Sequence, residues 1–341
     1  MKHVHRCRTR FAAVLCFAVA LGLAANVGTA TKAWAQEEDV AIEDMLEMDF
    51  DQLMDITVTS ASKRAEKISD APATVIVVTS DQIIERGYNN LIDALGDLPG
   101  MDIILPYGDD YVRNYWRGYR NVISAPYLFM IDGIEFNQLY LNSAYIMGAV
   151  PLSNVERIEV VYGPASSIYG ANAFMCIINV ITRKDAGEPE DWEFTSDTRV
   201  TYGSNQRWIE DATARWSKGK WDMSLTLRFE DGNLRDDKVN NDYEYTRDRY
   251  ARDESLWGGF ADGFDSRIEN RAVDLRVGYG QTEFIFQYYQ LNSGYGYVYP
   301  TDRGQADGEW IREELSYTLN HDWDITERLS SKSSMRYRES D

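Results

Sequence analysis

The sequence predicts a membrane β-barrel of which only the first strands are present, preceded by a small α/β domain. The stretch from Val155 to Thr182 separates the two parts. Val155–Tyr162 alternates as a β-strand, Gly163-Pro164 ends it, and residues 177–182 form a second, apolar strand. From Trp192 onward, apolar and polar residues alternate between aromatic ends, a pattern typical of strands with one face in lipid.

The first 35 residues have the pattern of a secretory signal peptide. Met1–Arg10 is basic, residues 11–27 are apolar, and Ala33-Trp34-Ala35 forms a cleavage site before Gln36. A retained membrane anchor is the alternative, but the apolar run is short for a span. Export without a later apolar run of 18 residues indicates the periplasm, the outer membrane or the outside of a two-membrane bacterium.

Composition limits the partners of the chain. The formal net charge of −20 argues against nucleic-acid binding. A solvated, repulsive surface is the preferred interpretation, ahead of acidic loops that face a cationic ligand. Cys7 and Cys16 fall in the leader, so the mature chain holds only Cys176 and no internal disulfide.

The α/β domain is expected over residues 63–186. Residues 73–79 predict a strand, and Thr79-Ser-Asp-Gln82 is a capping box for a helix over residues 81–86. Asn90 is expected to cap a second helix over residues 91–95. Asp132-Gly133 is typical of a two-residue hairpin turn.

The region from 192 to 341 predicts about seven strands. Residues 221–229 show the pattern clearly, with Trp, Met, Leu, Leu and Phe on one face and Asp222, Ser224, Thr226, Arg228 and Glu230 on the other. A soluble β-sandwich would alternate too, but charges and amides on the second face favour a wet lumen. Strict alternation places the turn at 203–206 and the long loop after residue 230 outside the cell, and the turns at 217–220 and 280–281 in the periplasm.

Several motifs in this order resemble the plug domain of TonB-dependent outer-membrane receptors. The stretch VERIEVVYGPASSIYGANAFMCIINVIT resembles the end of that plug, with Phe174, Met175 and Cys176 where small residues are usual. Two earlier steps also match the family, Arg117-Gly118 and Asp132-Gly133. The remaining motif residues are Glu156, Arg157, Glu159, Gly163, Pro164, Tyr169, Gly170 and Asn179.

The resemblance implies an architecture larger than this chain. Such receptors hold the plug in the lumen of a barrel of about 22 strands. At this strand length, roughly 300 further residues would complete the barrel. The chain is therefore expected to be truncated within the barrel.

The resemblance also implies an energy-coupling box within the lead at residues 36–62. The match covers Asp55, Ile56, Thr57, Val58, Thr59, Ser60 and Ala61. An extended segment with free backbone groups can add as a strand to a partner's sheet. The implied partners are the TonB protein with its inner-membrane energising complex, and outer-membrane lipid.

The implied function is active transport of a large, scarce nutrient, with a ferric siderophore as the leading substrate. Cobalamin is second, with haem or an oligosaccharide behind. The candidate ligand residues at the plug apices are Tyr107, Tyr111, Arg113, Tyr140, Asn142 and Tyr145. The alternative role for each is to seal the plug against the wall. A passive porin or adhesion barrel, or a free periplasmic binding protein, are the rival interpretations.

No catalytic pattern is present. The sequence has no Ser/His/Asp set, no zinc spacing and no phosphate loop, so we expect no enzyme and no cofactor. The acidic loop over residues 231–242 could bind Ca²⁺. Its spacing does not match an EF-hand, and a solvated loop is the preferred interpretation.

Overall fold

The computed structural model describes residues 57–61, 66–104, 113–116, 127–139, 142–170, 172–184, 189–233, 267–294, 309–326 and 329–340. Several predicted features lie outside these residues: the signal peptide, Asp55, Ile56, Tyr107, Tyr111, Arg117, Gly118, Tyr140 and the loop beyond Asn233.

The plug is built on a five-stranded sheet with the order β3-β8-β9-β6-β7. The two strands predicted around residue 163 are confirmed as β8 (Val155–Tyr162) and β9 (Cys176–Thr182), which pair antiparallel. β3 (Thr74–Thr79) pairs antiparallel with β8, and β6 (Tyr127–Ile131) runs parallel to β9. β7 (Ile134–Glu135) follows β6 through a tight turn in which Asp132 and Gly133 both have positive φ, as the Asp-Gly pair predicted.

Two short helices begin at the predicted caps. The Thr79 side chain accepts from Gln82 N in a complete capping box before α4 (Ser80–Glu85), and Asn90 caps α5 (Leu91–Gly96). The turn after β8 holds a one-turn helix that the sequence did not predict, α6 (Ser166–Tyr169), between Gly163 and Gly170. Both glycines have positive φ, a conformation that other residues rarely adopt.

The remaining plug elements are short. They are β1 (Thr57–Val58), β2 (Glu66–Lys67), the 3₁₀ helices η1 (Ile68–Asp70) and η2 (Tyr145–Ala149), β4 (Met101–Ile104) and β5 (Arg113–Trp116). β1 pairs with β2, and β4 pairs with β5.

The C-terminal part forms a seven-stranded antiparallel sheet in sequence order, which agrees with the predicted number of strands. The strands are β10 (Glu193–Tyr202), β11 (Trp208–Lys218), β12 (Trp221–Asn233), β13 (Arg267–Tyr279), β14 (Thr282–Gly294), β15 (Glu309–Thr326) and β16 (Leu329–Ser340). The end that carries the turns at residues 219–220 and 280–281 is called the short-turn end below.

One face of the large sheet buries many polar and charged side chains with some apolar ones among them, and the other face exposes apolar side chains. Thr226, Arg228 and Glu230 of β12 are almost fully buried, while Trp221 on the other face is 44% exposed. The same alternation marks β13 and β14. The outward face therefore offers lipid an apolar surface, as the alternation predicted.

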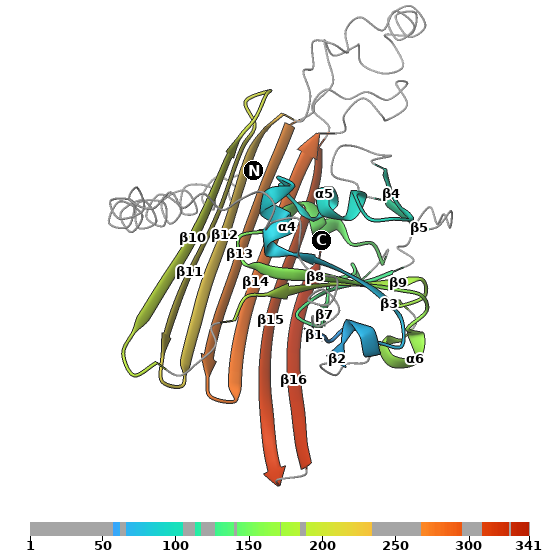
Figure 1. Cartoon of the computed structure of the whole chain (residues 1–341). Coiled ribbons are helices and arrows are strands. Elements are labelled where there is room, and N and C mark those ends of the chain that lie inside the picture. The colour runs from blue at the N-terminus through green and yellow to red at the C-terminus, as the bar shows by residue number, and fades with distance from the viewer. Residues whose placement is uncertain are drawn as a thin grey trace, which may run out of the picture.

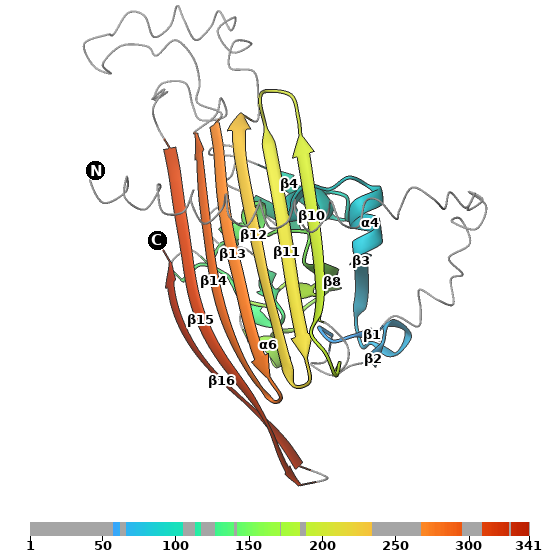
Figure 2. The same cartoon turned by 90° about the vertical axis from the view of Figure 1, so that its left-hand side faces the viewer.

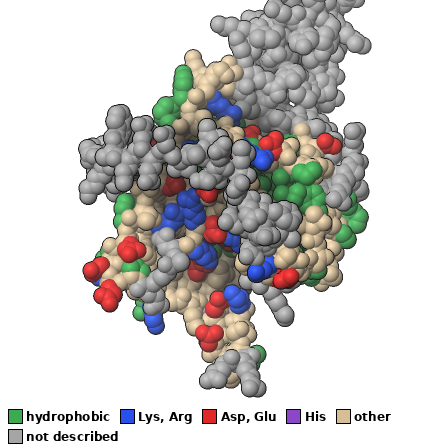
Figure 3. Space-filling model, in the orientation of Figure 1, with side chains coloured by type: hydrophobic (Ala, Val, Ile, Leu, Met, Phe, Trp, Pro, Cys, Tyr) green, Lys and Arg blue, Asp and Glu red, His purple; other side chains and the backbone are tan. Residues whose placement is uncertain are grey.

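The plug lies against the buried face of the sheet (Figures 1 and 2). The sheet does not close on itself, and β10 and β16 are its edge strands. One hydrophobic cluster joins them, since Ala272, Tyr289 and Leu291 of the sheet pack with residues of the plug core. Figure 3 shows basic and acidic side chains along the sheet beside the plug. No helix among the described residues is long and apolar enough to cross a membrane.

Candidate functional site

The described part of the candidate coupling box, residues 57–61, is docked on the plug. Thr57 and Val58 pair with Lys67 and Glu66, and Val58 is fully buried. Ser60 and Ala61 are buried as well. The segment is therefore held in place, whereas the sequence predicted an extended segment with free backbone groups.

The Glu159 carboxylate of β8 holds this segment. Its Oε2 accepts hydrogen bonds from Thr59 N at 3.0 Å, Ser60 N at 2.9 Å and Ser60 Oγ at 2.5 Å. Its Oε1 accepts from Arg157 Nε at 2.9 Å and pairs with Arg157 Nη2 at 2.9 Å. A fully buried carboxylate needs such compensation, so Glu159 depends on these partners as much as they depend on it. Burial, with the Glu159 charge nearby, raises the pKa of Tyr169 to about 12.

Asn179 of β9 connects the docked segment to the turn between β6 and β7. Its Nδ2 donates to Ser60 Oγ at 2.9 Å, and its Oδ1 accepts from Gly133 N at 3.0 Å. The two polar atoms of this side chain thus bind residues that lie 119 and 46 positions away in the sequence. The sequence identified Asn179 as a motif residue but gave no sign of this bridging role.

Asp132 binds the same turn to the large sheet of β10–β16, which is called the wall below. It accepts from Thr182 N at 2.9 Å and from Thr182 Oγ1 at 2.8 Å, and it pairs with Arg276 of β13. Arg276 also binds the Asp274 carboxylate through Nε at 2.8 Å and Nη2 at 3.0 Å. Burial alone would raise the pKa of Asp132, but Arg276 and the two Thr182 hydrogen bonds outweigh it and hold that pKa below its usual value.

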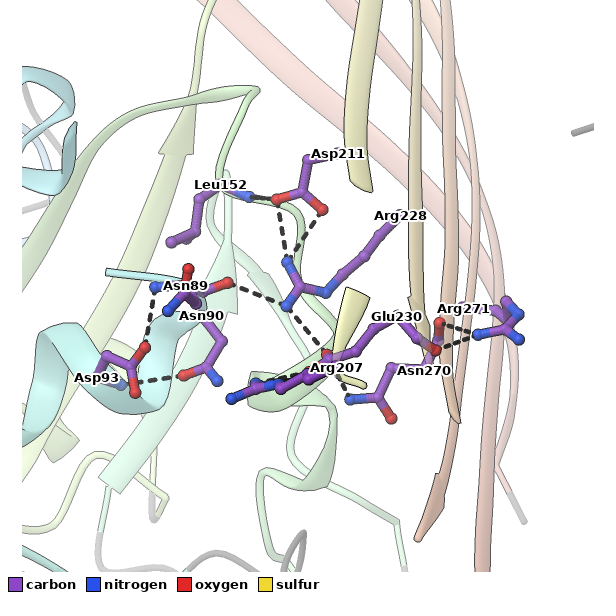
Figure 4. Close-up of polar contacts among 10 residues, drawn as sticks. All are labelled: Asn89, Asn90, Asp93, Leu152, Arg207, Asp211, Arg228, Glu230, Asn270 and Arg271. Atoms are coloured by element: carbon purple, nitrogen blue, oxygen red, sulfur yellow. Dashed lines mark hydrogen bonds and ion pairs between the residues drawn. The ribbon is translucent and has the colours of Figure 1, made fainter. Parts of the chain in front are cut away.

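A second contact between plug and wall is centred on the fully buried Arg228 of β12 (Figure 4). Its Nη1 lies 3.0 Å from both oxygens of Asp211, and Asp211 also accepts from Leu152 N at 3.1 Å. Its Nη2 donates to Asn89 O at 3.0 Å and to Glu230 at 3.1 Å. Arg228 thus joins two carboxylates of the wall to the loop that precedes α5.

Glu230 has further partners in the wall. It accepts from Arg207 at 2.9 and 2.6 Å and from Asn270 at 3.0 Å (Figure 4). The alternation of β12 predicted that Arg228 and Glu230 face the lumen. It gave no partner for either, because Asp211 and Asn270 come from other strands and Arg207 comes from the turn before β11.

The segment just before β8 follows β11 at successive inward positions. Leu152 bonds to Asp211, Ser153 Oγ lies 2.9 Å from Thr213 Oγ1, and Asn154 Oδ1 accepts from Arg215 at 2.7 Å. Three consecutive plug residues therefore meet alternate residues of one strand. We call this set the β11 ladder.

Phe136 is the aromatic contact between plug and wall. Arg336 and Arg338 of β16 lie over its ring, 4.5 and 5.7 Å from the centroid, and Tyr289 meets it edge-on at 5.8 Å. Arg338 also donates to Asn137 O at 2.6 Å. The plug is thus attached along β11, β12, β13, β14 and β16.

Three of the six predicted ligand residues, Arg113, Asn142 and Tyr145, lie in the described part of the chain. Tyr145 is buried in η2, 4% exposed, with Arg312 of β15 at 5.1 Å from its ring centroid. This position fits the sealing role. Asn142 has a positive φ of 52° and donates its backbone N–H to Gln138 O, and Arg113 lies in β5.

A polar cavity of about 550 Å³ lies at the short-turn end between plug and wall. Its lining includes Asp132, Gly133 and Ile134 from the plug and Arg276 from β13, with polar residues of β12, β14, β15 and β16. In the described part of the chain, no cluster of three or more His, Cys, Asp and Glu residues could hold a metal ion. The candidate Ca²⁺ loop lies almost wholly outside that part.

Comparisons with known proteins agree with this architecture. Residues 67–176 match the family model of the TonB-dependent Receptor Plug Domain. The chain is 23% identical over 286 residues to the vitamin B12 transporter BtuB of Vibrio vulnificus (strain CMCP6), a match that spans 82% of this chain and 43% of that protein. The chain therefore spans less than half the length of this relative.

Two solved structures show the same fold. The alcaligin outer-membrane receptor FauA of Bordetella pertussis has a TM-score of 0.57 and 15% identity, over 83% of this chain and 42% of that one. The closed form of the ferric-catecholate import receptor Fiu of E. coli K12 has a TM-score of 0.56 and 17% identity, over 84% and 39%. The plug match over residues 67–176, the similarity to BtuB and the plugged sheet together support a TonB-dependent receptor.

Proposed function

We propose that the protein containing this chain imports a large, scarce nutrient across the outer membrane of a Gram-negative bacterium. The energy comes from the TonB protein and its inner-membrane complex, which bind the box at residues 55–61. The observation that carries the proposal is the non-covalent docking of residues 57–61 on the plug, beside a plug of the matching family.

The docked geometry defines what the partner must do. A strand added from TonB needs the backbone groups of Thr59 and Ser60, whose N–H groups are bound to Glu159. The box must therefore leave the Glu159 carboxylate before or while it pairs with the partner. The hydrogen bonds that hold it are reversible, so undocking needs no covalent step.

The location in the outer membrane is supported by the outward apolar face of the large sheet. A ferric siderophore remains the leading substrate, with cobalamin second and haem or an oligosaccharide behind. Similarity to a ferric-catecholate import receptor and to a vitamin B12 transporter supports testing both leading classes.

The deciding experiment is uptake in cells that express the full-length protein, with wild type compared with Val58→Pro. Ferric siderophores and cobalamin are offered in turn, and surface binding is measured in parallel. Pro removes a backbone donor from the docking strand. We expect unchanged binding and lost uptake.

Thr57→Ala is the matched control, because Thr57 lies on the same strand with an exposed side chain and alanine keeps the backbone N–H. It should take up substrate as wild type does. Full uptake by Val58→Pro would contradict the box assignment and favour a passive porin or adhesion barrel.

A further inference from the structure

The cavity at the short-turn end shares residues with the attachment of the plug to the wall. Asp132 and Gly133 form part of its lining, and so does Arg276. The ion pair between Asp132 and Arg276 therefore joins plug and sheet within the lining of this cavity. A movement of the turn at 132–134 would change the size and access of the cavity.

The same turn is joined to the docked segment by a short chain of hydrogen bonds. Ser60 Oγ donates to Glu159 and accepts from Asn179, and Asn179 accepts from Gly133 N. The neighbouring residue, Asp132, then binds the wall at Arg276. The side chain of Asn179 touches both the segment, at Ser60, and the turn, at Gly133.

Both ends of this chain lie near the short-turn end. β1 and β7 both lie toward the lower turns of the large sheet in Figure 1, and Figure 2 places β1 at the same level.

We infer that this cavity is the chamber through which a polar, charged substrate leaves toward the periplasm, and that Asn179 is the positioning residue that ties the Asp132–Arg276 ion pair in its lining to the docked segment. Loss of the Ser60 contact frees Asn179, the turn at 132–134 loosens, and that ion pair opens. This inference rests on the proposed function. It adds the exit site and the residue that links it to the box.

The charge of the lining fits such a substrate. Arg183, Lys184 and Lys220 face the cavity along with Asp222 and Glu283, so groups of both signs are available. A mixed polar lining solvates a charged solute without holding it tightly, which release requires.

The test measures coupling between the two ends by thiol labelling of the full-length protein, without substrate and without TonB. Reporter cysteines replace the exposed Thr57 in the segment or Ile134 in the cavity lining. The native Cys176 is fully buried, and burial raises the pKa of its thiol, so it contributes no fast labelling.

Ser60→Ala should raise the labelling rate at residue 134 by at least about 5-fold, and Asp132→Asn should raise the rate at residue 57 by a similar factor, because coupling between two sites is reciprocal. Asn179→Ala should raise both labelling rates. Adding Ser60→Ala to Asn179→Ala should not raise the labelling rate at residue 134 any further. Ser166→Ala is the matched control. It removes a plug hydrogen bond outside the chain, from Ser166 Oγ to Ala173 O, and should leave both rates unchanged.

A faster rate at residue 57 with an unchanged rate at residue 134 in Ser60→Ala would overturn the link. If Asn179→Ala does not fold, Ser60→Ala and Asp132→Asn still test whether the docked segment and the turn at 132–134 are coupled. Labelling needs no transport, so a failed link leaves uptake as evidence for the proposed function. A working link combined with full uptake by Val58→Pro would overturn the proposed function instead.

The exit role is tested by a bulky maleimide at Ile134→Cys. We expect uptake to fall while surface binding stays the same. The same label at Asp191→Cys, an exposed residue before β10 and outside the cavity lining, should leave uptake unchanged. Full uptake with residue 134 labelled would overturn the cavity as the exit.

Discussion

Ser60 donates to one oxygen of Glu159 from both its backbone N–H, at 2.9 Å, and its hydroxyl, at 2.5 Å, across 99 residues of sequence. The same oxygen accepts from Thr59 N. One buried carboxylate oxygen thus holds the segment that the proposed function assigns to the TonB protein. This contact therefore contributes to how often the segment is free, together with the β1–β2 pairing and the burial of Val58.

Glu159→Gln should release the segment. The amide keeps one acceptor oxygen but loses the charge, and a hydrogen bond to a charged group contributes about 1.5–3 kcal/mol. We expect trypsin to cleave after Lys63 or Arg64 about 10-fold faster in the variant, as followed by mass spectrometry of the intact protein. Glu156→Gln is the control on the same strand, where the side chain is 48% exposed. Equal cleavage rates in all three proteins would show that Glu159 does not hold the segment.

Asp132→Asn should change the dependence of plug stability on pH. The pKa of Asp132 is lowered in the folded state, so its ionised form stabilises the fold above the ordinary carboxyl pKa of about 4. That contribution is lost as the pH falls through the lowered value. The variant should be less stable than wild type by about 3 kcal/mol at pH 7, with the difference shrinking in strong acid.

The measurement is urea unfolding of the plug in detergent-solubilised protein at several pH values. Asp81→Asn, at the exposed start of α4, controls for the loss of a surface charge. A difference for Asp132→Asn that stays constant from neutral to strongly acid pH would rule out the ion pair with Arg276 as its source.

Arg228→Lys should weaken the attachment of the plug near α5. A lysine cannot reproduce the fork that reaches Asp211, Glu230 and Asn89 O together, and a buried pair that loses its partner costs about 3–5 kcal/mol. We expect the folded form to convert to the unfolded form at a temperature several degrees lower, as seen in the shift of mobility on a denaturing gel. Arg199→Lys on β10, where the side chain is only half-buried, should behave as wild type.

Leu225→Arg tests the lipid contact of the outward face. Leu225 pairs with Leu275 in the middle of the apolar rows, whereas Tyr279 lies at the short-turn end. An arginine at the middle of a membrane strand costs about 2–4 kcal/mol, and near the interface about 0–1 kcal/mol. Leu225→Arg should therefore lose much more stability in lipid vesicles than Tyr279→Arg does. Equal losses would contradict a membrane-spanning sheet.

Local signals predicted the local structure. Thr79 and Asn90 begin their helices because a cap and its partner lie three residues apart in sequence. The period-two pattern of β12 predicted which side chains face inward, because the pleat alone fixes that. The one-turn helix α6 was missed, since four residues are too few to show a helical period.

The contacts of the candidate site required the tertiary structure. The alternation of Val155–Tyr162 is consistent with Arg157 and Glu159 on one side of the strand, where they pair. It did not predict the register shift between Val155 and Arg157, or that Glu159 is fully buried while Arg157 is not. The partners Ser60, Asn179 and Gly133 come together only when β1, β9 and the β6–β7 turn are folded. The assignment of the box and of the ligand residues stays a prediction.

The β11 ladder has a consequence for assembly of the protein. Leu152, Ser153 and Asn154 meet Asp211, Thr213 and Arg215, which share one face of β11. If β11 slipped by one residue against its neighbours, all three would turn to the opposite face, into lipid. A sheet with the wrong register could not form these three contacts with the plug. Binding of the plug therefore favours the native register of the sheet during assembly.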